Sequence, residues 1–151
     1  MIGYRVRRWT SCERLDDIMA MVHAAFEGFT PPSGALKETS ADLAKRQRDG
    51  FVLVVMENDE FIGSVFCAVK DDSLYLTRMA TRPDHWGDGV GRAMLRAAED
   101  EARRMGLPKL SLHVRKNLPG NRDYFARVGF VVTGEGQEKG RTPFDVMEKA
   151  L

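Results

Sequence analysis

The sequence has few cysteines and no long apolar run. Its two cysteines, Cys12 and Cys67, are too few for a disulfide framework and do not form a metal-ligand pair, so we expect no metal site. Cys67 lies in an apolar segment and is predicted to be a buried small residue. No stretch is apolar enough over sufficient length to cross a bilayer, and no secretory leader pattern is present. We therefore expect a cytoplasmic location and no membrane partner.

The chain also lacks an excess of either charge. With 23 Lys and Arg against 22 Asp and Glu, its formal net charge is +1, which argues against nucleic acids and anionic membranes as partners. Internal repeats and low-complexity tracts are absent as well. A chain of 151 residues can bury about two-thirds of its unfolded surface, so residues 1–151 are predicted to form one domain.

What the sequence does contain is a glycine-rich turn between a strand and a helix. Residues 74–81 are typical of a strand, Gly87, Gly89 and Gly91 follow, and apolar residues then recur at helical spacing as far as Met105. Glycines at alternate positions let backbone N–H groups converge, and the helix start adds its own unpaired N–H groups. The turn therefore predicts a binding site for a phosphate or pyrophosphate.

Two better-known phosphate loops do not fit this turn. A P-loop has Lys-Ser or Lys-Thr after its last glycine, whereas Arg92-Ala93 follows Gly91. A dinucleotide fingerprint has a third glycine where Met94 stands. His85, just before the glycines, is predicted to be solvated.

The other elements follow from hydrophobic periodicity and turn residues. Strands are predicted over residues 2–9, 51–56, 61–69, 74–81, 110–114, 130–133 and 144–148, and helices over 10–26, 39–50, 91–105 and 121–128. The first three strands after the second helix should form an antiparallel meander, and the long helix should place residues 110–114 parallel to residues 74–81.

Helix starts and one loop are also predicted from local patterns. Thr10 and Glu13 have the spacing of a capping box, Thr39 and Asp42 offer a start for the second helix, and Asn121 can cap the last helix. Residues 28–36 contain two prolines and two glycines, which exclude regular structure.

This order of elements resembles that of the GNAT N-acyltransferase superfamily over the whole chain. The resemblance implies an α/β (α+β) fold, the GNAT fold, with a mixed, mostly antiparallel sheet of about seven strands and four helices. In that fold the parallel strands, here residues 74–81 and 110–114, splay apart around the acyl-CoA.

The glycine turn matches the acyl-CoA loop of that family, which reads Gln or Arg, two residues, Gly, one residue, then Gly or Ala. Gly89 and Gly91 take the two glycine positions, and Gly87 also matches a common family choice. Trp86 stands at the Gln/Arg position and departs from the pattern. The tripeptide Val128-Gly129-Phe130 matches the end of the family's fourth helix.

The resemblance also implies acetyl-CoA as the acyl donor, without a metal. A backbone N–H of the central strand would face the thioester oxygen, and such oxyanion donors are worth about 3 kcal/mol elsewhere. An asparagine would contact the pantetheine arm, although the spacing of neither candidate is clean, and an aromatic ring would pack on the thioester. The residues expected to bind the cofactor are Met79, Ala80, Thr81, Gly87, Asp88, Gly89, Val90, Gly91, Arg92, Asn117, Asn121 and Phe125.

In the family, the segment between the first two helices lines the acceptor site. Here that segment offers Phe29, Pro32, Ser33 and Glu38 as residues that would bind an amine. A plain polar surface loop is the alternative interpretation. Nothing in the sequence names the amine.

Direct transfer of an acyl group to an amine needs a base, because the free ammonium has a pKa near 10, and an acid can help the thiolate to leave. The family's usual acid is a tyrosine at the position of Phe125, and Tyr124 would point about 100° away around the helix. Three interpretations remain: Tyr124 acts as the acid after a shift in the helix, the thiolate leaves without an acid, or catalysis is weak. We favour departure of the thiolate without an acid, because a thiol with a pKa near 8.5 is a fair leaving group. Glu38, His113 or a water relay could serve as the base, and a Cys67 nucleophile is the least favoured route.

The function expected is therefore an N-acetyltransferase that moves an acetyl group from acetyl-CoA to a primary amine, most simply of a small molecule. A homodimer is compatible with this, since many relatives pair. Acetylation of a protein amine is one alternative. A non-catalytic acyl-CoA sensor is another, suggested by Phe125 and Trp86, and nucleotide binding without CoA is a third that the glycine spacing disfavours.

Overall fold

The computed structural model describes residues 3–151, which contain one seven-stranded sheet in the order β1-β2-β3-β4-β5-β7-β6. The strands are β1 (Val6–Arg8), β2 (Phe51–Glu57), β3 (Glu60–Lys70), β4 (Ser73–Thr81), β5 (Lys109–Arg115), β6 (Val131–Gly136) and β7 (Phe144–Ala150). The helices are α1 (Leu15–Phe26), α2 (Ser40–Asp49), α3 (Val90–Arg104) and α4 (Pro119–Arg127), with short 3₁₀ turns η1 (Gly34–Lys37) and η2 (Pro83–His85). Neighbouring strands are antiparallel except β4 and β5, which are parallel. The predicted mixed fold, the meander and the parallel central pair are confirmed.

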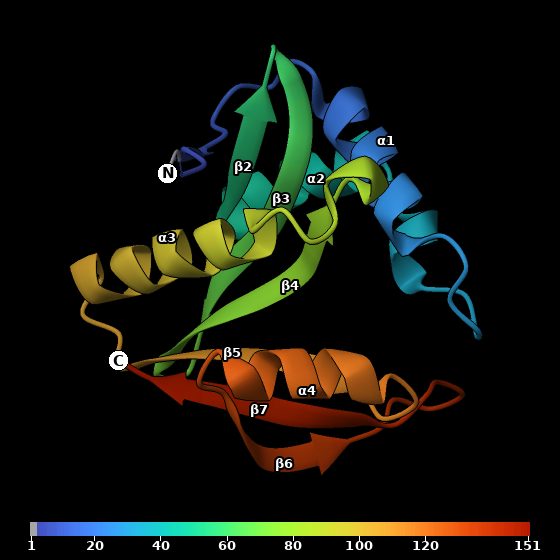
Figure 1. Ribbon diagram of the computed structural model, residues 1–151, viewed down its shortest axis with the longest axis vertical. Helices are drawn as coiled ribbons and strands as arrows, with labels where there is room; N and C mark the ends of the chain where they lie inside the picture. The colour runs from blue at the N-terminus through green and yellow to red at the C-terminus, as the bar shows by residue number, and fades with distance from the viewer. Residues whose placement is uncertain (1–2) are drawn as a thin grey trace.

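The two parallel strands pair over only part of their length. Their register ends at Leu76 opposite Leu112, although β4 continues to Thr81 and β5 to Arg115. In Figure 1 the strands meet at the left and diverge to the right, with β5, β7 and β6 below the opening. The far end of β4 therefore has an edge without a strand partner among residues 3–151.

A bulge in β4 accompanies this divergence. Thr77 pairs with Phe66, but Ala80 pairs with Ser64, so β4 has one residue more than β3 between these pairs. Arg78 lies in the bulge with a left-handed φ of 51°, a conformation that costs a non-glycine residue about 1 kcal/mol. Bulges bend a strand and increase its twist, which turns the end of β4 away from β5.

Helices cover both faces of the sheet. On one face, α3 buries Val90, Met94 and Ala98 against the strands, and on the other face α1 and α2 bury a second cluster that includes Ile18 and Leu43. Figure 1 shows α3 and α4 in front of the sheet and α2 behind it. No helix within residues 3–151 has the length and apolar character needed to cross a membrane.

Several predicted boundaries were wrong. The first strand spans only Val6–Arg8, and the predicted residue Ile2 lies outside the described part of the chain. Thr10 does not cap α1, because that helix begins later, after Arg14 in a left-handed conformation and without a side-chain cap. The last two strands are also shifted or extended, to β6 and β7 as given above.

The loop and cap predictions had mixed outcomes. The start of α2 lies where Thr39 and Asp42 predicted it, and these two residues form a capping box there. Asn121 is not a cap, because α4 begins at Pro119, whose missing N–H suits the first turn. The loop of residues 28–36 is not wholly irregular, since η1 begins within it, and the Ser33 hydroxyl accepts a hydrogen bond that caps this turn.

Candidate active site

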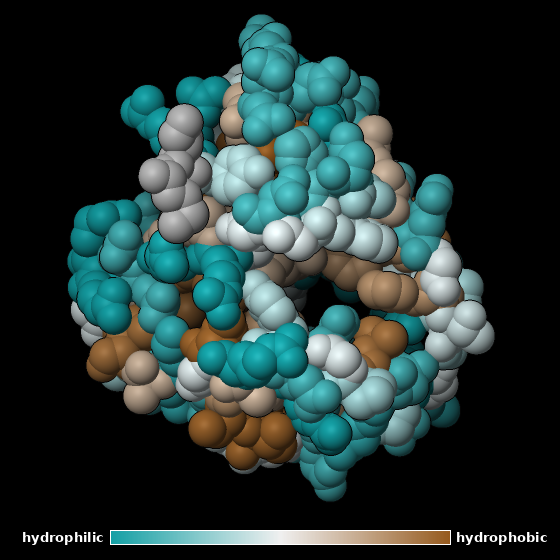
Figure 2. Space-filling view, viewed as in Figure 1, coloured by the Kyte–Doolittle hydropathy of each residue, from teal (hydrophilic) through white to brown (hydrophobic). Residues whose placement is uncertain are grey.

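A cavity of about 750 Å³ fills the opening between β4 and β5. Met79 and Thr81 of β4 form one wall, and His113 of β5 forms another. The first turn of α3 and the inner side of α4 close it further. Figure 2 shows the corresponding hollow between the upper and lower parts of the molecule.

The loop before α3 presents backbone amides to this cavity. Gly87 and Gly89 have φ values of 86° and 90°, and a Cβ on either would meet no atom within 4 Å, so the loop surface is open. Most backbone amides of this loop have no hydrogen-bond acceptor within residues 3–151. They are the amides of Gly87, Gly89, Val90, Gly91 and Arg92. Unpaired N–H groups at the positive end of a helix dipole suit a pyrophosphate.

Two neighbours of this loop differ from expectation. The Asp88 amide donates to the His85 carbonyl at 3.2 Å, and the Asp88 side chain does not line the cavity. The prediction that His85 is solvated was wrong, because its side chain is only 13% exposed. The ring lies between Glu57, at 3.4 Å, and Asp88, at 3.2 Å.

The residues predicted to bind the pantetheine arm, through the backbone for residues 79–81, divide into two groups. Met79, Thr81 and Asn121 line the cavity. The Ala80 side chain is buried on the α1 side of the sheet, so only its backbone can face the opening. The Asn117 amide instead donates to a backbone carbonyl in the loop after α1, at 2.9 Å, and does not line the cavity.

Both aromatic residues of α4 line the cavity. The Phe125 ring packs edge-on against Tyr124 and Phe130, with centroids 5.2 and 5.6 Å apart. The Tyr124 hydroxyl lies beside Gly91, 3.2 Å from where a Cβ on that glycine would stand. Burial raises the pKa of Tyr124, so its hydroxyl stays protonated at neutral pH. Tyr124 thus reaches the glycine-loop end of the cavity.

A second cavity, of about 930 Å³, adjoins the first on the η1 side. Of the predicted acceptor residues, Pro32 and Glu38 line this second cavity and Phe29 lines the first. A few residues line both and so mark the junction. They are Ser33, Arg78, Arg115 and Arg141.

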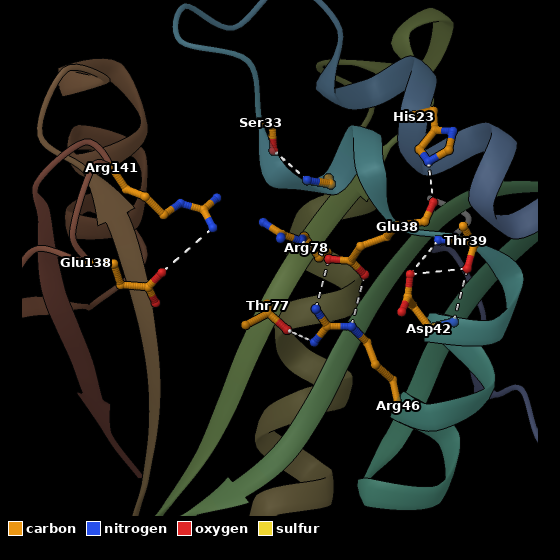
Figure 3. A network of polar contacts seen from close by, with 11 residues as sticks. His23, Ser33, Glu38, Thr39, Asp42, Arg46, Thr77, Arg78, Glu138 and Arg141 are labelled. Carbon is orange, nitrogen blue, oxygen red and sulfur yellow. Dashed lines mark hydrogen bonds and ion pairs between the residues drawn. The ribbon is translucent and has the colours of Figure 1, made fainter.

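The carboxylate of Glu38 is held between two arginines. Arg46 donates to its two oxygens at 2.9 and 3.2 Å, and Arg78 Nε donates at 2.6 Å (Figure 3). Arg46 also donates to the Thr77 hydroxyl at 3.0 Å. Glu38 therefore anchors two cations, and a substrate ammonium would have to compete with them.

His113 is the other predicted base. It lies just beyond the last β4–β5 pair, its Nδ1 is 3.2 Å from the Tyr75 hydroxyl, and its ring stacks on Phe144 at 4.2 Å. Burial and, to a lesser degree, the charge of Lys70 lower its pKa, so the ring is neutral at neutral pH. Cys67, in contrast, is buried and its thiol pKa is raised by that burial, so no thiolate is available there. No group of three or more possible metal ligands occurs in the described residues.

Sequence reasoning missed the three arginines at the junction. The one sequence pattern that pointed to any of them is the two-residue spacing of His113 and Arg115, which places both side chains on one face of β5. Arg78 depends on an unforeseen bulge, and Arg141 lies in a loop with no periodicity.

Comparisons with known proteins agree with this geometry. The family model described as Acetyltransferase (GNAT) family matches residues 15–130. Among solved structures, the PaiA N-acetyltransferase from Thermoplasma acidophilum in complex with coenzyme A has a TM-score of 0.83 at 17% identity, covering 99% of this chain and 100% of that one. Ard1 from Thermoplasma volcanium has a TM-score of 0.80 at 17% identity, covering 99% of both chains. The IAA acetyltransferase from Bacillus cereus has a TM-score of 0.73 at 16% identity, covering 99% and 100%. The chain belongs to the GNAT acetyltransferase family.

Proposed function

We propose that this protein is an acetyl-CoA-dependent N-acetyltransferase whose acceptor is a primary amine of a small molecule. The observation that supports it most directly is the run of unpartnered amides at the start of α3, beside an opening lined by a free strand edge. These features suit the pyrophosphate and the pantetheine arm of coenzyme A respectively. The second cavity gives the amine an entrance separate from that of the cofactor.

Each part of the site then has a role. The amides between Gly87 and Arg92 hold the pyrophosphate, and the edge of β4 from Met79 to Thr81 bonds the pantetheine arm. A backbone N–H of this edge donates to the thioester oxygen as negative charge develops there. The amine attacks the thioester carbon, so the C–N bond forms as the C–S bond breaks.

Proton transfer falls to His113 in this proposal. Its ring is neutral, lines the cavity and lies where β4 and β5 separate, so it can take a proton from the attacking amine directly or through one water. The thiolate leaves without an acid, because Phe125 stands where the family has a tyrosine and Tyr124 reaches the other end of the cavity. Glu38 keeps its two arginines in place.

A charge placed among the loop amides tests this proposal. Gly91 has a negative φ in the first turn of α3, so Gly91→Asp and Gly91→Asn should both fold, and they differ only in charge. We expect the aspartate to weaken coenzyme A binding about 10- to 100-fold relative to the asparagine, by repulsion of the pyrophosphate. Calorimetry measures the binding, and thiol release from acetyl-CoA with a panel of amines measures turnover.

The wild-type protein decides between the competing functions. Thiol release that depends on an amine would support the enzyme. Coenzyme A binding without release on any amine would favour the sensor instead. No binding of coenzyme A by the wild type would contradict the assignment of the glycine loop.

A further inference from the structure

Three arginines from separate segments meet where the two cavities adjoin. Arg78 comes from the bulge of β4, Arg115 ends β5, and Arg141 lies in the loop between β6 and β7. A Cβ on Gly34 would lie 2.6 Å from an Nη atom of Arg141 and 3.1 Å from one of Arg78, so both guanidinium groups reach the same place. Figure 3 shows Arg141 pointing from its loop toward Arg78.

The carboxylates at this junction do not balance the arginines. Glu38 is shared by Arg78 and a further arginine of α2, and the ion-pair partner of Arg141 is Glu138, at 3.7 Å. Among residues 3–151, Arg115 has no carboxylate within ion-pair distance. Four guanidinium groups thus face two carboxylates, a net charge of +2. The other charged side chains that line the second cavity are two lysines and two aspartates, which cancel.

Arg115 is held in place without charge neutralisation. It donates to the backbone carbonyls of Pro31 and Pro32 at 2.6 and 3.0 Å. Burial and then the nearby positive charges of Arg141 and Arg78 lower the pKa of Arg115, because the three cations repel one another. A guanidinium fixed in this way still has N–H groups suited to a planar or tetrahedral anion.

We propose that the acceptor amine also carries an anionic group, a carboxylate or a phosphate, which Arg115 and Arg141 bind together with Arg78. The inference rests on the proposed function, because it names the class of acceptor for the same site. Arg78 and Arg115 follow the last β4–β5 pair by two and three residues, or about 7 and 10 Å along the strands. An amino group a few bonds from the anion therefore reaches the opening where the thioester carbon would lie.

The first test compares acceptors that differ only in the anion. Free amino acids are assayed beside their carboxamides, and phosphoethanolamine beside ethanolamine, with thiol release from acetyl-CoA as the readout. We expect kcat/KM to be about 10- to 100-fold higher for the anionic member of at least one pair, the range of a charge-assisted hydrogen bond. Which pair shows it tells a carboxylate from a phosphate.

Variants then connect the preference to the arginines. Arg115→Gln and Arg141→Gln should each raise KM for the anionic amine about 10-fold or more, with a smaller change in kcat. Arg115→Lys keeps the charge but loses the planar fork, so it should retain part of the preference. Arg48→Gln removes the same charge from an exposed position of α2 outside both cavities and is the matched control.

Folding and function can be separated in this experiment. Coenzyme A affinity serves as the folding check, and Arg141→Gln remains informative if Arg115→Gln misfolds, because the Arg141 side chain makes no hydrogen bond within residues 3–151. Equal turnover within every pair, or turnover confined to amines without an anion, overturns the inference. Failure of coenzyme A to bind, or binding without turnover of any amine, overturns the proposed function instead.

Discussion

At the scale of single residues, Tyr124 is the group whose position most changes its expected role. Its hydroxyl lies beside Gly91, where the phosphates would bind, and its raised pKa keeps it a hydrogen-bond donor. We expect Tyr124→Phe to raise KM for acetyl-CoA several-fold, about the loss of one hydrogen bond, and to leave kcat within about twofold. Initial-rate kinetics on the best amine measures both.

An acid role for Tyr124 would give the opposite pattern. Loss of a general acid lowers kcat by about 100-fold or more, with little change in KM. Phe125→Tyr restores the hydroxyl at the position where the family has its acid, and serves as the reciprocal variant. A gain in kcat from that change would show that thiolate departure limits the wild-type rate.

The sequence predicted some residues of the site better than others, for a physical reason. Gly87, Gly89 and Gly91 were recognisable because the glycine backbone itself forms the proposed phosphate-binding turn. The contacts of Arg115 and Arg141 were not, because their long side chains meet residues far away in the chain. Local spacing carries no information about such meetings.

At the scale of elements, Gly50 joins helix α2 directly to strand β2, with no loop between them. It stands between the end of α2 and the start of β2, and a Cβ there would lie 2.0 Å from the Cys67 carbonyl oxygen in β3. Since that oxygen belongs to the backbone, the strand would have to move. We expect Gly50→Ala to lower the free energy of unfolding by about 3 kcal/mol, measured by urea titration.

Gly120→Ala is the control for this prediction. Gly120 lies in the first turn of α4, and a Cβ there would meet nothing within 4 Å. Alanine should therefore be neutral or stabilise the protein by up to about 1 kcal/mol through its higher helix propensity. Equal stability of the Gly50 and Gly120 variants would show that α2 and β3 can separate without loss.

Element order was predictable, whereas element ends were less so. Residues 51–56 are a continuous apolar run, residues 61–69 and 74–81 lie between turn residues, and each of the three segments became a strand of the sheet. The start of α1 was misplaced because Thr10 and Glu13 had a capping spacing that the chain does not use; the Ser11 hydroxyl instead accepts a hydrogen bond from the Glu13 amide at 2.9 Å. Competing local hydrogen bonds of this kind cannot be ranked from sequence alone.

At the scale of the whole molecule, α3 connects the two parts of the sheet that the opening separates. Glu101 of α3 pairs with Arg8 of β1 at 2.5 Å, and Glu99 of α3 pairs with Lys149 of β7 at 2.9 Å. The direct ladder between β4 and β5 is short, so these ion pairs add to the apolar packing of α3 across the divide. The helix that begins at the glycine turn therefore also spans both sides of the cavity between β4 and β5.

This arrangement predicts how stability depends on pH. The hydrogen bond from Arg8 is the main cause that lowers the pKa of Glu101 below its usual 4.5, so the unfolded chain binds the proton more readily. The stabilisation is thus present above pH 4.5 and is lost as the pH falls through the folded-state pKa.

We expect Glu101→Gln to be less stable at neutral pH and to lose less stability on acidification below about pH 5. Urea titrations across that range measure this, and Asp100→Asn on the exposed side of the same helix should give a curve parallel to the wild type. If the Glu101→Gln curve were also parallel to the wild type, the pair between α3 and β1 would not contribute to holding the sheet together.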